Sequence, residues 1–131
     1  YDPLVENGDV GWRRTIYRFV PRGGRNPFLD TFDCPDPSAA AQRRPVTTTP
    51  LQALALLNND LVFRIAETLA DTARRQTGDE TVTQVAWIIE TTLGRQASEQ
   101  ELQQAVQFIR EFGLPAWCRI LLNSNEFVYV R

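Results

Sequence analysis

The sequence contains no histidine, no lysine and no methionine among its 131 residues. Without histidine it can hold neither a Ser-His-Asp or Cys-His catalytic centre nor a His-ligated zinc, and it lacks the commonest general base. Without lysine it can form no Schiff base and no P-loop. Because an initiator methionine is also missing, we expect the chain to be a domain or processed piece of a longer protein. These absences exclude particular chemistries, and the residues present dictate no reaction.

The overall composition predicts one globular domain. The hydrophobic share is 43% and the charged share 23%, close to globular averages, and this length can bury one core without a metal or several disulfides. A formal net charge of -2 gives no general attraction to nucleic acid or to a membrane surface. No apolar run approaches the roughly 18 residues of a membrane span. We expect no metal, no cofactor, no nucleic-acid partner and no membrane span in this chain.

Residues 1–49 have the composition of an irregular segment, since they hold six of the eight prolines. The stretch 13–20 is rich in β-branched and aromatic residues and predicts a strand. The stretch 29–37 should lie extended, because a residue before proline disfavours the helical region. We expect an Arg/Pro/Gly-rich extended segment that packs on the rest of the domain.

From residue 49 onward the pattern becomes helical. Thr49 followed by Pro50 is typical of a helix start, and the stretch 51–57 is apolar on nearly every side, so we expect that helix to be central. Further helices are predicted over about 60–76, 79–93, 99–112 and 115–122. Gly94 ends the third, Ser98 and Glu101 form a capping box for the fourth, and Pro115 opens the fifth.

The predicted fold is therefore mainly α. Residues 50–131 form a bundle of about five helices, residues 1–49 pack on it, and the whole is one compact domain. At most a small two-stranded sheet joins 13–20 to a short strand at 127–130. On the helix surfaces we expect an i,i+4 pair between Asp71 and Arg75, and Val82 should face inward with the apolar stripe of its helix.

Arginines are concentrated near the N-terminus. Residues 10–29 hold five arginines and no acid, and Arg43 and Arg44 precede a predicted helix start, an arrangement that can bind an anion. The alternative is a structural role, in which these arginines form ion pairs with acids of the helical half. Arg43 and Arg44 would then bind Glu126 or Asp60. The candidate anion-binding residues are Arg13, Arg14, Arg18, Arg43 and Arg44.

The sequence allows two interpretations of the cysteine pair and two of the three aspartates. Cys34 and Cys118 are either joined in a disulfide, which would close a loop of about 84 residues and stabilise by roughly 4 kcal/mol, or are two free thiols. Neither can be activated by histidine. Asp30, Asp33 and Asp36 have oxygen ligands suited to calcium but lack the EF-hand spacing, so loop or helix-cap carboxylates are the favoured reading.

Several stretches in a fixed order resemble one family. They are Arg13–Tyr17, Thr31–Asp36, Arg43-Arg44, Thr47–Asn59, Leu93-Gly94-Arg95 and Cys118–Phe127. Together they look like the C-terminal part of the planctomycete-type domain of unknown function 1553, over about residues 9–131. The resemblance implies a large exported parent with upstream domains in the envelope or outside the cell, which favours the Cys34–Cys118 disulfide. It supplies no reaction and no catalytic residues.

Three functions follow as hypotheses. The first is a non-catalytic structural or interaction module of a large exported multidomain protein, with the upstream domains of the same parent as partners. The second is a module that binds an acidic glycan or another anion through the N-terminal arginines. The third is part of an enzyme active site that upstream sequence completes.

Overall fold

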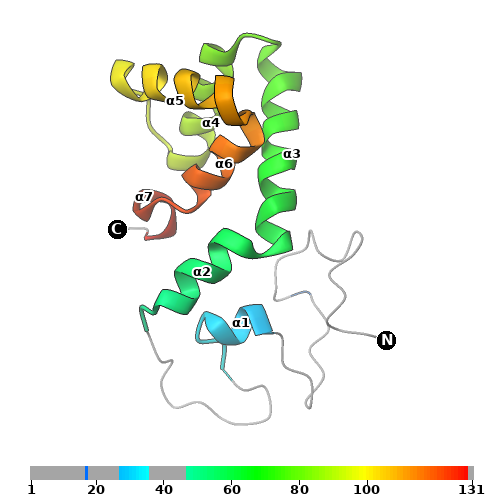
Figure 1. The fold of residues 1–131 in the computed structure, drawn as a ribbon, viewed down its shortest axis with the longest axis vertical. Helices are drawn as coiled ribbons and strands as arrows, with labels where there is room; N and C mark the ends of the chain where they lie inside the picture. Colours follow the sequence, from blue (N-terminus) through cyan, green and yellow to red (C-terminus); the bar gives the residue numbers. More distant parts are fainter. Residues whose placement is uncertain (1–16, 18–26, 36–46, 130–131) are drawn as a thin grey trace. The chain divides into compact units, whose positions relative to one another are not determined.

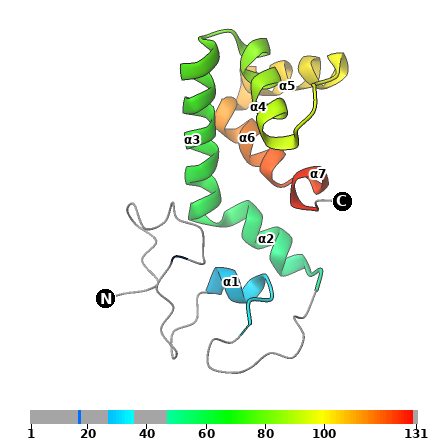
Figure 2. The same ribbon diagram turned by 180° about the vertical axis from the view of Figure 1, so that it is seen from behind.

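The structure is a computed structural model that describes residues 17, 27–35 and 47–129, most of them helical (Figures 1 and 2). It confirms the mainly α class: the described ranges contain helices and no strand. The chain divides into two compact units, Tyr1–Leu61 and Val62–Arg131. The strand predicted at 13–20 lies outside the described residues except at Tyr17, which is in a 3-10 turn. Within those same ranges no helix is long and apolar enough to cross a bilayer.

The first unit contains α1 (Pro27–Thr31) and α2 (Pro50–Asn58), which pack against each other. Helix α1 corrects the expectation that the chain is extended from residue 29. Pro27 occupies the first turn, where its missing N–H leaves nothing unpaired and its fixed φ suits a helix. The Leu29 carbonyl then accepts hydrogen bonds from the amides of Phe32 and Cys34, both at 3.0 Å. The helix therefore ends before Pro35 restricts the backbone.

Helix α2 begins at the predicted cap. The Thr49 hydroxyl accepts from the Gln52 amide at 3.3 Å, and the Gln52 side chain accepts from the Thr49 amide at 3.1 Å, a complete capping box. Asp33 is also tied to this start, since its carboxylate accepts from the Thr47 amide at 2.7 Å and from the Thr47 hydroxyl at 2.8 Å. Asp33 thus serves as a loop carboxylate that joins the turn after α1 to the approach of α2.

The expectation that α2 is the central helix is wrong for the described structure. None of its residues is buried, and Leu51, Leu54 and Leu57 are 68%, 54% and 43% exposed. These three residues form the α2 leucine face. The sequence pattern shows that a helix is apolar, whereas burial requires a neighbour. Within this unit the neighbouring helix is α1, and its five residues are too few to cover α2.

The second unit is the larger bundle. It holds α3 (Asp60–Thr77, from Val62 on), α4 (Thr81–Leu93), α5 (Glu99–Phe112), α6 (Leu114–Leu122) and α7 (Asn125–Val128). Helices α4, α5 and α6 pack around Val85, Ile89 and Ala105. Both views show α3 running beside them (Figures 1 and 2), and its small side chains allow a close approach. Its buried residues are Val62, Ala66, Ala70 and Ala73.

The buried stripe of α4 differs from the predicted one at its start. Val82 is 42% exposed and not inward, while Ile88 is fully buried. In the first turn the buried position belongs to Gln84, whose amide nitrogen donates to the Gly78 carbonyl at 2.6 Å. That bond satisfies a polar side chain in the core and ties α4 to the turn that precedes it.

The surface pair predicted on α3 is also different. Asp71 accepts from Arg74 at 3.0 Å and not from Arg75, whose guanidinium donates to the Thr72 hydroxyl at 3.1 Å. Positions three and four residues apart are both neighbours on a helix, so the periodicity alone does not choose between the two arginines.

The last described residues form a helical turn where a strand was predicted. The stretch 127–130 has strand-like composition, but Ser124 caps a new helix by accepting from the Phe127 amide at 3.3 Å. The helix predicted over about 115–122 is α6. Asn123 caps α6, and Ser124 opens α7 directly after it. Local capping therefore outweighs β propensity here.

Candidate functional site

Arg95 is the centre of the most connected polar group in the described structure. It follows Gly94, which ends α4 in the left-handed conformation with φ of 69°. Its guanidinium donates to both Glu126 oxygens, from Nε at 2.6 Å and from Nη2 at 2.9 Å. It also donates to both Glu101 oxygens, from Nη2 at 2.6 Å and from Nη1 at 3.0 Å. The fifth bond runs from Nη1 to the Gln96 carbonyl at 3.1 Å.

We call Arg95, Glu101 and Glu126 the Arg95 clamp. A guanidinium has five N–H groups, and here each has an acceptor. The clamp joins the loop after α4 to the first turn of α5 and to α7. Because it joins three elements, the clamp holds the bundle together. Every N–H of Arg95 is used within it, so it offers no hydrogen-bond donor to an added anion.

Glu101 also takes part in the capping box at the start of α5. Its Oε2 atom accepts from the Ser98 amide at 2.8 Å and from the Ser98 hydroxyl at 2.7 Å, while the Ser98 hydroxyl accepts from the Glu101 amide at 3.3 Å. This is the predicted capping box of α5, and it is confirmed. One carboxylate therefore caps α5 and binds Arg95.

The clamp is fully charged at neutral pH. The bonds from Arg95, and then those from Ser98, lower the pKa of Glu101 to about 2. Arg95 likewise holds the pKa of Glu126 below its ordinary value, and the two carboxylates, Glu126 first, raise the pKa of Arg95. One cation and two anions leave the clamp with one excess negative charge.

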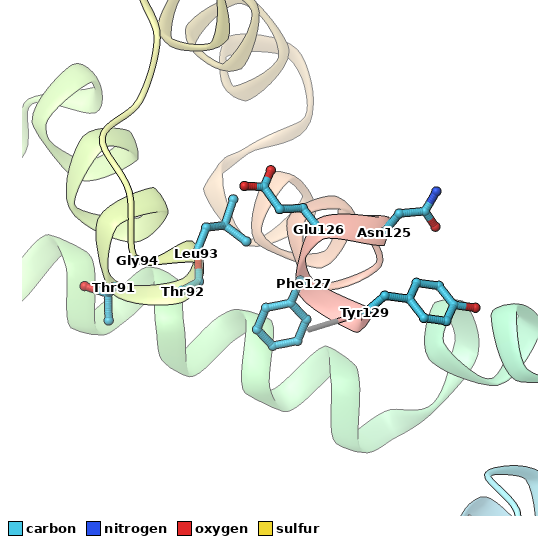
Figure 3. Close-up of a pocket in the computed structure, with 8 residues that line it drawn as sticks. All are labelled: Thr91, Thr92, Leu93, Gly94, Asn125, Glu126, Phe127 and Tyr129. Atoms are coloured by element: carbon cyan, nitrogen blue, oxygen red, sulfur yellow. The ribbon is translucent and has the colours of Figure 1, made fainter. Parts of the chain in front are cut away.

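An open groove lies between the end of α4 and α7, beside the clamp (Figure 3). Phe127 and Tyr129 are 38% and 52% exposed, and their rings extend to different sides of α7 (Figure 3). The Thr92 hydroxyl donates to the Ile88 carbonyl at 2.7 Å. The lining residues are Thr91, Thr92, Leu93, Gly94, Asn125, Glu126, Phe127 and Tyr129.

The groove presents aromatic rings, hydroxyls, an amide and one carboxylate. Among the residues that the structure describes, Glu126 is the only charged one that lines the groove, so the groove is suited to neutral or cationic groups. A search of the described ranges finds no group of three His, Cys, Asp or Glu placed to hold a metal ion. Of the aspartates considered as calcium ligands, Asp33 binds Thr47 and Asp36 lies outside the described residues.

The predicted anion-binding residues lie outside the described residues. They are Arg13, Arg14, Arg18, Arg43 and Arg44, and an anion site formed by them stays a prediction. One acid suggested as a partner for Arg43 and Arg44 has another partner in the structure, because Glu126 is bound by Arg95.

The two cysteines are free thiols in the structure and belong to different units. Cys34 is half-buried, whereas Cys118 is fully buried in α6. Burial raises the pKa of the Cys118 thiol to about 12, which suppresses the reactive thiolate. The disulfide between them stays a prediction.

We expect the two thiols to differ in reactivity. Brief treatment of the reduced, folded chain with iodoacetamide should alkylate Cys34, while Cys118 should react only after unfolding. Mass spectrometry of the intact chain and its peptides measures both. Equal rates at the two positions would contradict the burial of Cys118. A chain that resists alkylation and gains two hydrogen masses on reduction would instead establish the predicted disulfide.

A second unusual arginine lies on α6. The guanidinium carbon of Arg119 is 4.8 Å from the centre of the Phe63 ring, so the cation stacks on α3. Its buried Nε atom has no hydrogen-bond acceptor among the residues that the structure describes. Stacking on a ring thus stands in place of an ion pair at this contact between α3 and α6.

A comparison with protein-family models gives one match. The model described as "Protein of unknown function (DUF1553)" matches residues 3–109. The chain belongs to the DUF1553 family. The match includes Arg95 and Glu101 of the clamp and ends before Glu126. Searches of curated proteins and of solved structures find no match.

Sequence reasoning identified parts of the clamp but not the clamp itself. Glu101 was assigned to a helix cap, and Arg95 and Glu126 fell within the stretches that resemble the DUF1553 family. The available signal was an arginine directly after a helix-ending glycine, with no nearby partner assigned to it. Its link to Glu126 spans 31 positions and depends on tertiary packing.

Proposed function

We propose that this member of the DUF1553 family is a non-catalytic interaction module that binds upstream domains of a larger exported protein. The observation that carries the proposal is the α2 leucine face. Helix α2 has a capping box at its start and a cap at its end, yet its three leucines are exposed. The exported setting rests on what the family resemblance implies.

The energetics favour such a contact. Burying a leucine side chain contributes about 1.5–3 kcal/mol, so Leu51, Leu54 and Leu57 together can stabilise a docked neighbour. Clustered exposed apolar side chains are typical of interaction surfaces. A neighbour in the same polypeptide is present at a high effective concentration, so a small apolar face is sufficient for it. We therefore assign the face to an apolar surface of the upstream part of the same protein.

The test compares two exposed apolar positions on different helices. The upstream part of the parent is produced separately and titrated with the 131-residue chain by calorimetry. We expect the wild-type chain to bind, Leu54→Gln to weaken binding at least about ten-fold, and Val82→Gln on α4 to bind like wild type. Absence of wild-type binding, or equal binding by the two variants, would overturn the proposal.

A second candidate function rests on the acid-free arginine run at 10–29. In this proposal Arg13, Arg14 and Arg18 bind an acidic glycan, because guanidinium groups bind sulfate and carboxylate groups well. Titration with a sulfated polysaccharide should give salt-sensitive binding. Replacing the three residues with Gln should abolish it, whereas the same change at Arg74, Arg75 and Arg110 should not. Salt-independent binding, or equal loss in both triple variants, would exclude this function.

A further inference from the structure

We infer that the groove between the end of α4 and α7 binds a cationic side chain, an arginine or lysine presented by a partner segment. The inference is independent of the α2 leucine face, because the groove belongs wholly to the second unit. It rests on three properties of the groove: an excess negative charge, exposed aromatic rings, and an acceptor held in place by Arg95.

The excess charge comes from the clamp and from α4. Arg95 compensates one of its two carboxylates, and each of its N–H groups is already used. The groove also meets the C-terminal end of α4, where the helix dipole is negative. Helices α3, α5 and α6 each carry arginine in their last turn, but α4 has no basic residue there. A cation bound at this end interacts favourably with the negative end of the α4 dipole.

The aromatic rings add a surface that suits a cation. Phe127 and Tyr129 are partly exposed, and their rings lie on different sides of α7 (Figure 3). The face of an aromatic ring attracts guanidinium and ammonium groups, and the same protein already uses this contact between Arg119 and Phe63. Aromatic rings beside a clamp with one excess negative charge are unfavourable for an anion, so the groove discriminates by charge.

The acceptor is Glu126. Its side chain is 49% exposed, so a ligand can reach it although Arg95 donates to both of its oxygens. Arg95 also keeps the carboxylate ionised. A side chain that is already oriented loses little freedom when it binds. The groove therefore offers one charge-assisted hydrogen bond and one ring contact to a single cationic group.

The experiment uses a short peptide as probe. The ¹⁵N-labelled chain is titrated with acetyl-Ala-Arg-Ala-Arg-Ala-amide and with the same peptide carrying citrulline, which is neutral and nearly isosteric. Arg131 is changed to Gln in every sample so that the chain's own last cation does not compete. We expect saturable shifts of the Gly94, Phe127 and Tyr129 amides with the arginine peptide, weaker at high salt, and none with citrulline.

Two variants localise the contact. Tyr129→Leu leaves the clamp intact and should weaken binding about three-fold, while Phe112→Leu, an exposed aromatic on α5, should have no effect. Glu126→Gln should weaken binding about ten-fold. Equal shifts with both peptides, shifts centred on Glu67 and Asp71 of α3, or equal effects of the two leucine variants would each overturn the inference.

Discussion

Truncation of Ile89 to alanine should lower the free energy of unfolding by about 2–5 kcal/mol, whereas truncation of Leu54 should change it by no more than about 0.5 kcal/mol. Ile89 is 2% exposed in the core formed by α4, α5 and α6, so its loss leaves a cavity. Leu54 is exposed on α2, and alanine is an equally good helix former there. Urea unfolding followed by tryptophan fluorescence and circular dichroism measures both.

The comparison tests the exposure of the α2 leucine face, which the sequence pattern did not predict. From sequence alone α2 is the most apolar helix and should be the costliest to truncate. If Leu54→Ala lowers the unfolding midpoint as much as Ile89→Ala with an unchanged denaturant slope, the leucine face is buried by other parts of the same chain. The α2 leucine face would then be core, and the proposed docking role would fail with it.

Replacing Arg95 with glutamine should destabilise the second unit by about 1–2 kcal/mol at pH 7. Hydrogen bonds to charged groups contribute more than neutral ones, but this guanidinium is partly exposed and its contribution is reduced by solvent screening. The substitution also leaves Glu101 and Glu126 facing each other without a cation. The Tyr129 amide, which donates to Asn125 in α7, should exchange its hydrogen faster.

The matched control is Arg110→Gln on α5, which removes the same charge from an exposed position and should change stability by less than about 0.5 kcal/mol. The pH dependence gives a second check. The folded-state pKa of Glu101 is about 2, below its ordinary value of 4.5. Its stabilisation is therefore complete above about pH 4.5 and is lost as the pH falls toward 2. The difference between wild type and R95Q should shrink over that range. A constant difference would show that the clamp is not ionic.

Local signals in the sequence predicted much of the helical framework. Thr49 with Gln52 and Ser98 with Glu101 are capping boxes in the structure as in the sequence, and Gly94 ends α4 with a positive φ. Each of these features depends on residues within four positions of one another. Helix ends can therefore be predicted from the local sequence without knowledge of the fold.

Features that depend on tertiary contacts were not predictable in the same way. Glu126 is bound by Arg95, and nothing in the sequence spacing selects Arg95 over Arg43 or Arg44 as its partner. The apolar pattern of α2 gave no information about whether a neighbour covers it. The strand prediction at 127–130 was wrong for a different reason. The β-branched and aromatic composition favoured a strand, whereas Ser124, which directly follows one helix, caps the next one.

The double task of Glu101 sets a limit on how this protein can change in evolution. Aspartate is one methylene shorter, and glutamine has an NH2 donor in place of one acceptor oxygen, so neither can cap α5 through Ser98 and also receive two bonds from Arg95. A substitution at Glu101 must be accompanied by changes at both Ser98 and Arg95 to be neutral. In an alignment of DUF1553 sequences these three positions should therefore vary together, while Glu126, which has one partner, should drift with Arg95 alone.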